Sequence, residues 1–95
     1  MVENRKLYVV AYDIPDDKRR AKVHNLLSAY GEWTQYSLFE LFLTDKQRIA
    51  LLERLHTILR ESQGSVRLYP LCDANLQQVI TLGSKPPRER KEYII

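Results

Sequence analysis

The sequence predicts an α+β sandwich in which two helices cover one face of an antiparallel sheet. Short β-branched and aromatic runs alternate with stretches of helical spacing, in the order strand, helix, strand, strand, helix, strand. The three glycines, at positions 31, 64 and 83, each fall where a periodic segment stops. The 95 residues suit one domain. Split βαβ units in this order give the ferredoxin-like βαββαβ fold.

Composition narrows the class of protein. Hydrophobic residues make up 44% of the chain and charged residues 28%, which is typical of a globular protein. No apolar run approaches the roughly 20 residues of a membrane helix, and the first residues lack a secretory pattern. The one cysteine, Cys72, excludes an internal disulfide framework, and a small buried core position is expected for it. We expect a cytoplasmic protein, and so small a core favours a two-fold homodimer.

The first strand and the first helix have clear signals. Residues 7–12 predict a buried central strand, and Pro15 marks a turn into an amphipathic helix over 16–30. Gly31 is expected to end this helix in the C′ position. Apolar positions of the helix recur at spacings of three and four and are expected to face the core: Val23, Leu26, Leu27 and Tyr30.

Residues 33–43 carry a change of phase. Tyr36 and Leu38 are apolar at even positions, whereas apolar residues also follow at odd positions, with Glu40 between: Phe39, Leu41 and Leu43. A strand cannot keep one buried face through such a switch, so we expect a bulge or tight turn near residues 37–39. Whether the segment is one bent strand or two short strands stays open.

The second half repeats the pattern. Thr44 opens a capping box for a helix that is expected to reach about Glu61. A strand over 65–69 is closed by Pro70, and a further strand is expected over 77–82. The helix is expected to bury four apolar residues: Ile49, Leu52, Leu55 and Leu59.

The further strand has no place in a four-stranded sheet. Pairing with a second copy of the chain would use it and would cover an exposed sheet edge. We therefore divide the sequence into a ferredoxin-like domain, 1–83, and an extended C-terminal tail, 84–95. The end of the tail has strand-forming residues that would add to a partner chain: Tyr93, Ile94 and Ile95.

Asp13 is the first candidate for chemistry, because it stands at the carboxyl end of an apolar strand. Asp is also a preferred helix N-cap, so an equally supported interpretation is that Asp13 caps the first helix with Asp16 at N3. Magnesium takes one or two carboxylates and keeps several waters. Two Asp13 side chains across a two-fold axis would therefore suffice for Mg²⁺, which lowers the pKa of bound water and offsets phosphodiester charge.

The densest basic cluster follows Asp13 directly and comprises Lys18, Arg19, Arg20 and Lys22. A charge run is most often a solvated helix face. Cations near the amino end of a helix interact unfavourably with the helix dipole, which slightly lowers stability. Their presence there therefore suggests a function for these side chains, namely contact with nucleic-acid phosphates. Asp16 would support Asp13 or interact with the helix dipole. His24 and His56 have no partner at metal or catalytic spacing, and we find no Gly-rich phosphate loop or paired RNA-binding aromatic motif.

Three segments resemble the CRISPR-associated protein 2 family. The string YVVAYDIPDDKRR, residues 8–20, is similar to the opening of that family, which has a hydrophobic strand, Tyr-Asp-Ile, an acidic pair and Arg-Arg. The match continues in QYSLFE, residues 35–40, and in VRLYPL, residues 66–71. Each segment alone is weakly specific, but three in order span nearly the whole chain.

The resemblance implies a ferredoxin-like homodimer in which the last strand of each chain joins the partner's sheet. It also implies spacer acquisition with the CRISPR-associated integrase, and a magnesium-dependent endonuclease acting on single-stranded RNA or double-stranded DNA. The family's metal-binding aspartate corresponds to Asp13, its arginines to Arg19 and Arg20, and its central phenylalanine to Phe39. The integrase-binding tail would include Tyr93, Ile94 and Ile95.

One departure from the family lies at Trp33-Thr34, where many members have Arg-Val. Losing that arginine removes a phosphate contact, and Trp33 would stack or pack instead. Two functions stay open: the endonuclease, and a non-catalytic DNA-binding bridge between integrase subunits with Asp13 only a helix cap. A toxin-type ribonuclease of the same fold is a more distant alternative.

Overall fold

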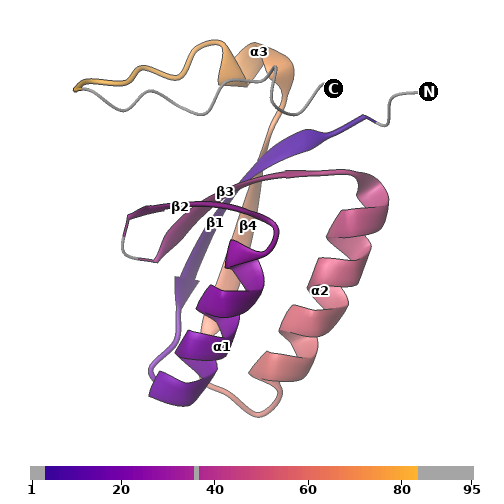
Figure 1. The fold of residues 1–95 in the computed structure, drawn as a ribbon, viewed down its shortest axis with the longest axis vertical. Helices are drawn as coiled ribbons and strands as arrows, with labels where there is room; N and C mark the ends of the chain where they lie inside the picture. Colours follow the sequence, from indigo (N-terminus) through magenta and orange to yellow (C-terminus); the bar gives the residue numbers. More distant parts are fainter. Residues whose placement is uncertain (1–3, 36, 84–95) are drawn as a thin grey trace.

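The computed structural model describes residues 4–35 and 37–83. They form a four-stranded antiparallel sheet in the order β2-β3-β1-β4, with α1 and α2 side by side on one face (Figure 1). This arrangement confirms the predicted ferredoxin-like α+β fold. No helix in these residues is long and apolar enough to span a membrane. The elements are β1 (Lys6–Asp13), α1 (Asp17–Ser28), β2 (Gly31–Gln35), β3 (Leu38–Leu43), α2 (Asp45–Leu59), β4 (Ser65–Leu71) and α3 (Asp73–Leu76).

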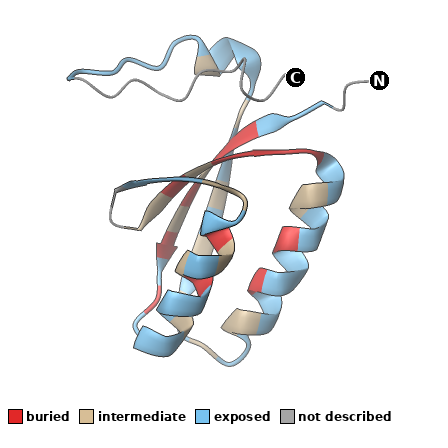
Figure 2. Cartoon of the chain, viewed as in Figure 1, coloured by how far each residue is buried: buried red, intermediate tan, exposed pale blue. Residues whose placement is uncertain are grey.

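The core lies between the sheet and the two long helices. β1 runs between β3 and β4, and its alternating residues Tyr8, Val10 and Tyr12 face the helices. Figure 2 shows the buried positions of α1 and α2 as short patches on helices that are otherwise exposed or half-buried. The helices contribute four fully or nearly fully buried side chains: Val23, Leu27, Leu51 and Leu55.

Asp16, rather than Asp13, caps the first helix. The Asp16 side chain accepts a hydrogen bond from the Lys18 backbone N–H at 3.3 Å, whereas Asp13 is the last residue of β1 and pairs with Ser65. The interpretation of Asp13 as a helix cap is therefore wrong. The capping box at the start of α2 is confirmed, because Thr44 exchanges hydrogen bonds with Gln47 at 2.9 and 3.1 Å.

The buried face of α2 differs from the prediction. Ile49 and Leu52 are 54% and 42% exposed, and Leu51 is buried in their place. Two apolar stripes overlap in this helix. The stripe that packs against the core contains Leu51, Leu55, Ile58 and Leu59. These residues are three or four positions apart or adjacent, as expected for the core-facing side of a helix.

Residues 31–43 form two strands rather than one. β2 and β3 pair as an antiparallel hairpin, with a register irregularity between Trp33 and Gln35. The prediction of Gly31 as a helix C′ residue is wrong, because α1 ends with Ala29 as C-cap and Gly31 begins β2. A Cβ at Gly31 would lie 2.4 Å from the carbonyl oxygen of Glu40, so glycine is required there by the close approach of β3.

The chain after α2 also departs from expectation. β4 continues through Pro70 to Leu71, and Cys72 is exposed at the start of α3 instead of buried. The strand expected over 77–82 is not formed, because none of the strands in residues 4–35 and 37–83 pairs with it. The apolar residues of this segment remain exposed: Val79 by 44%, Ile80 by 85% and Leu82 by 92%. The tail 84–95 lies outside the described residues.

Candidate nucleic-acid and metal site

Asp13 occupies a rigid and accessible position. It is the exposed last residue of the central strand, and alternation places it with Val9 and Ala11 on the sheet face opposite the helices. The chain passes close by at Gly64, where a Cβ would lie 3.0 Å from the Asp13 carbonyl oxygen. The neighbouring segment of Gly64 and Ser65 therefore fixes the backbone of Asp13, while its carboxylate points out of the core.

The residues present fit a magnesium ion only in part. A carboxylate is the hard oxygen ligand that Mg²⁺ prefers, and the exposed Asp13 leaves room for water ligands. Within residues 4–35 and 37–83, however, no three His, Cys, Asp or Glu side chains gather at one point. A second carboxylate, where Mg²⁺ takes two, would be supplied by Asp13 of another copy.

Arg19 joins the beginning of α1 to the end of α2. Its Nε donates to the Ile58 carbonyl at 3.0 Å and its Nη2 to the Arg60 carbonyl at 3.2 Å. Its Nη1 pairs with the Asp16 carboxylate at 3.2 Å. All three guanidinium nitrogens of Arg19 thus contact groups of the protein. Two of these groups are carbonyls at the C-terminus of α2, which would otherwise need other hydrogen-bond donors.

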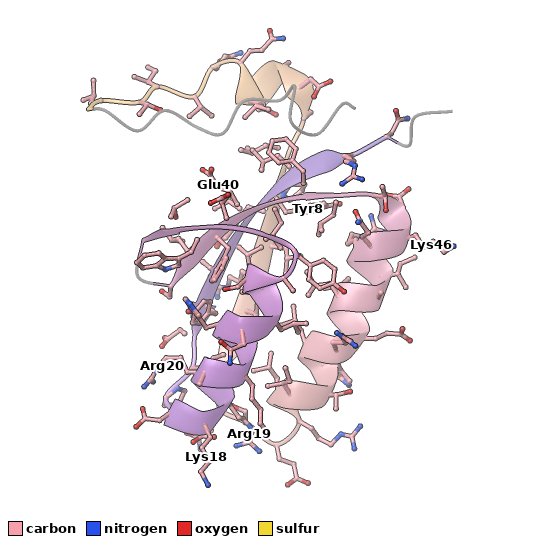
Figure 3. The ribbon with its side chains drawn as sticks, viewed as in Figure 1. Tyr8, Lys18, Arg19, Arg20, Glu40 and Lys46 are labelled. Carbon is pink, nitrogen blue, oxygen red and sulfur yellow. The ribbon has the colours of Figure 1, made fainter. Side chains whose placement is uncertain are left out.

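Arg20 is also used internally. Its Nη1 donates to the Ile14 carbonyl at 2.8 Å, and its Nη2 pairs with Asp17. This contact holds the loop that follows Asp13. Lys18 and Lys22 are exposed, and Figure 3 shows Lys18 extending into solvent from the first turn of α1. Of the four predicted phosphate contacts, the two lysines are thus the more available.

Replacing Arg19 with alanine is expected to lower the free energy of unfolding by about 1–3 kcal/mol. Hydrogen bonds that involve a charged group contribute about this much to stability. Because Arg19 is partly exposed, we expect a loss near the lower end of the range. Urea denaturation measures it, with Lys18→Ala as the control that should change stability by less than about 0.5 kcal/mol. Equal stability of the two variants would contradict the interhelical role of Arg19.

The sheet face opposite the helices, which we call the open face, is mainly apolar. Leu7 and Phe42 are buried, and Tyr69 is 49% exposed. The register places nine residues of β1, β3 and β4 on this face besides Asp13 and Ser65: Leu7, Val9, Ala11, Leu38, Glu40, Phe42, Arg67, Tyr69 and Leu71. An apolar sheet face of this kind is typical of an interface.

Glu40 lies on β3 (Figure 3), within the open face, and the strand register places it directly opposite Val9 and Glu32. Burial raises the pKa of the Glu40 carboxyl above its ordinary value of 4.5, and the negative charge of Glu32 raises it further. The folded chain therefore favours the neutral form of Glu40 more strongly than the unfolded chain does.

This pKa shift predicts a pH-dependent difference between the wild type and Glu40→Gln. The protonated form of Glu40 is favoured in the native state, so its contribution to stability is present below pH 4.5 and is lost as the pH rises through the raised pKa. Glu40→Gln is expected to be more stable than the wild type at pH 7, with the advantage disappearing in acid. Urea denaturation across this range measures the difference, and a constant difference would contradict the prediction.

His24 has partners that sequence spacing did not reveal. The Tyr12 hydroxyl lies 3.3 Å from His24 Nδ1, and the imidazole centroid is 5.2 Å from the ring of Phe39. Burial raises the pKa of the Tyr12 phenol, although the nearby Arg20 lowers it. Phe39 itself is completely buried, so it supports the site by packing. Trp33 completes the aromatic group, 6.2 Å from His24.

Comparison with known proteins gives the family. Residues 6–79 match the sequence profile of the family described as CRISPR associated protein Cas2. The chain belongs to the Cas2 family. It is 46% identical to the CRISPR-associated endoribonuclease Cas2 3 of Synechocystis sp. over 80 residues, which cover 84% of this chain and 87% of the relative. It is 43% identical to the CRISPR-associated endonuclease Cas2 2 of Thermus thermophilus, with 93% of each chain covered.

A solved structure adds a structural likeness. A chain of a partial Cas6-RT-Cas1–Cas2 complex superimposes with a TM-score of 0.75 at 28% identity, covering 88% of this chain and 92% of that one. Membership of the Cas2 family confirms the resemblance seen in the three sequence segments. The roles of Asp13 and of the lysines in this chain stay predictions.

Proposed function

We propose that this protein is a magnesium-dependent endonuclease of CRISPR adaptation, which cleaves single-stranded RNA or double-stranded DNA and works with the Cas1 integrase. The observation that carries the proposal is Asp13, an exposed carboxylate at the end of the central strand, on the open face. Family membership supports it, since similar proteins are named endoribonuclease or endonuclease. A structural relative in a Cas1–Cas2 complex supports the partner.

The site requires a homodimer, and the open face supports one. Two copies packed by their open faces would cover apolar surface, and a two-fold contact brings the same residue of each chain to equivalent positions. Asp13 lies at the end of this face, so both copies would supply a carboxylate. The exposed segment 77–82 would add as a strand to the edge of the partner's sheet, which explains its apolar side chains.

In this dimer the two Asp13 carboxylates would hold the ion, and the lysines would hold the substrate. When bound, Mg²⁺ supplies positive charge that activates water and offsets the charge that develops on the phosphodiester. Lys18 and Lys22 would neutralise substrate phosphates. Arg20 keeps the loop after Asp13 in place through the Ile14 carbonyl, so the carboxylate does not need to reorganise on binding.

A non-catalytic DNA-binding bridge between integrase subunits is the second candidate. It is favoured by the absence of a three-ligand cluster within the described ranges of this chain. In this function the same dimer and lysines would bind DNA, and Asp13 would end the strand without binding a metal.

The test combines oligomeric state with cleavage of labelled single-stranded RNA and duplex DNA, each with and without Mg²⁺. Tyr69→Arg places a charge on the open face, and Ile49→Arg places the same charge at an equally exposed apolar position of α2. The wild type and Ile49→Arg are expected to sediment as dimers and to cleave only with Mg²⁺. Tyr69→Arg is expected to be a folded monomer without activity.

Two outcomes would overturn the proposal. Cleavage by monomeric Tyr69→Arg at the wild-type rate would show that one chain suffices. A dimeric wild type that cleaves neither substrate with Mg²⁺, but binds duplex DNA, would leave the bridge as the function.

A further inference from the structure

Trp33 stands on the outer flank of the fold, where the edge strand β2 meets α1. It pairs with Phe39 in the register of β2 and β3, which places it on the helix-covered side of the sheet. The Trp33 side chain is nevertheless 53% exposed. Its ring centroid lies 6.2 Å from that of His24, with an interplanar angle of 66°. This edge contact orients the indole and leaves much of it accessible to solvent.

The proposed dimer does not account for this exposure. Within residues 4–35 and 37–83, the aromatic side chains with large exposed areas are Trp33 and Tyr69. Tyr69 belongs to the open face and would be covered by a second copy. Trp33 lies on the other side of the sheet, so it would remain accessible in the dimer.

The surroundings of Trp33 suit a nucleotide better than an apolar protein surface. Arg20 lies one helical turn before His24 on the same side of α1, and its side chain is 45% exposed. Ser28, one turn after His24, is exposed and polar. One accessible indole beside polar side chains is too small an apolar area for a stable protein interface. It has the dimensions of a single base.

Trp33 also lies at the same end of the sheet as Asp13. The Tyr12 backbone N–H donates to the Ser37 carbonyl at 3.2 Å, so the turn between β2 and β3 lies against the end of β1. Trp33 and Asp13 nevertheless lie on opposite faces of the sheet, so a strand whose base contacts Trp33 would have to pass around this turn to reach the carboxylate.

We propose that Trp33 is a stacking platform for an unpaired nucleobase of a single-stranded nucleic acid bound where β2 meets α1. The proposal rests on the proposed nucleic-acid function and adds a base-contacting residue to it. Every base has a π-face that can stack on an indole, so the contact selects unpaired over paired nucleic acid without reading sequence.

Trp33 is the one tryptophan of the chain, so its fluorescence reports this contact directly. The probes are a short oligothymidylate, the oligouridylate of equal length, and an abasic oligonucleotide with the same number of phosphates. We expect the two base-containing probes to quench Trp33 emission and the abasic probe to leave it nearly unchanged. The two base-containing probes also show whether DNA or RNA is preferred.

Affinity measured by fluorescence anisotropy of labelled probes gives the second readout. Trp33→Ala is expected to bind base-containing probes about tenfold more weakly and the abasic probe as the wild type does. Trp33→Phe keeps an aromatic face and should recover part of this loss. Lys18→Ala is the matched control, expected to weaken binding of base-containing and abasic probes alike.

The outcomes separate the two proposals. If Trp33→Ala binds all probes as the wild type does, or weakens base-containing and abasic probes equally, stacking is wrong while nucleic-acid binding stands. If the wild type binds no probe and no duplex, the proposed function fails and stacking fails with it. Circular dichroism of each variant checks that the fold is retained.

Discussion

Asp13→Asn is expected to abolish magnesium-dependent cleavage, by about a hundredfold or more, while leaving the fold intact. The amide removes the negative charge from the residue proposed to bind the ion, and in a homodimer it removes both charges at once. The side chain is exposed at the strand end, so the free energy of unfolding should change by less than about 0.5 kcal/mol. Initial cleavage rates at saturating Mg²⁺ measure the effect.

Asp17→Asn is the matched control for this experiment. It makes the same chemical change at an exposed acid nearby, on the helix rather than on the strand. Cleavage should survive in this variant. Equal cleavage by the wild type and Asp13→Asn would identify a contaminating nuclease or another site. If both bind duplex DNA and neither cleaves it, the bridge function is favoured.

Phe39→Ala is expected to lower the free energy of unfolding by about 3–5 kcal/mol. Phe39 is fully buried, and its ring contacts those of Tyr12 and His24, so truncation leaves a cavity at the centre of the core. Domains are commonly stable by only about 5–15 kcal/mol, so this variant should be marginally folded. Urea denaturation measures the loss, with Phe39→Leu as a control that fills most of the volume.

Cleavage by Phe39→Ala should fall with the folded fraction and return when a lower temperature or a bound nucleic acid restores folding. Loss of activity in a variant with wild-type stability would instead show that Phe39 acts on the substrate. The complete burial of the ring argues against such a contact.

The features predicted correctly from the sequence depend on local signals. The run around Val10 is apolar on both faces because β1 is central in the sheet, and Thr44 and Gln47 lie at capping-box spacing. Asp13 follows the last apolar residue of β1, so an accessible position could be predicted for it without knowing how the other elements pack. These elements needed no knowledge of distant contacts.

The features that were missed depend on partners far along the chain. The contact of Arg19 with Ile58 joins residues 39 positions apart, so it leaves no local pattern in the sequence. The buried stripe of α2 is decided by how the helix rotates against the sheet, since Ile49 and Leu51 are equally apolar. The strand expected over 77–82 has the right residues but pairs with no strand in the part of the chain that the structure describes.

The unpaired segment 77–82 and the open face have a thermodynamic consequence. If each chain completes its neighbour's sheet, part of the core forms only on association, and folding becomes linked to protein concentration by mass action. The thermal midpoint should then rise with concentration, and the monomer formed on dilution should be folded but less stable than the dimer. Cellular abundance would thereby set the fraction of folded protein, and substitutions at Val79 or Ile80 would change that fraction without touching the site around Asp13.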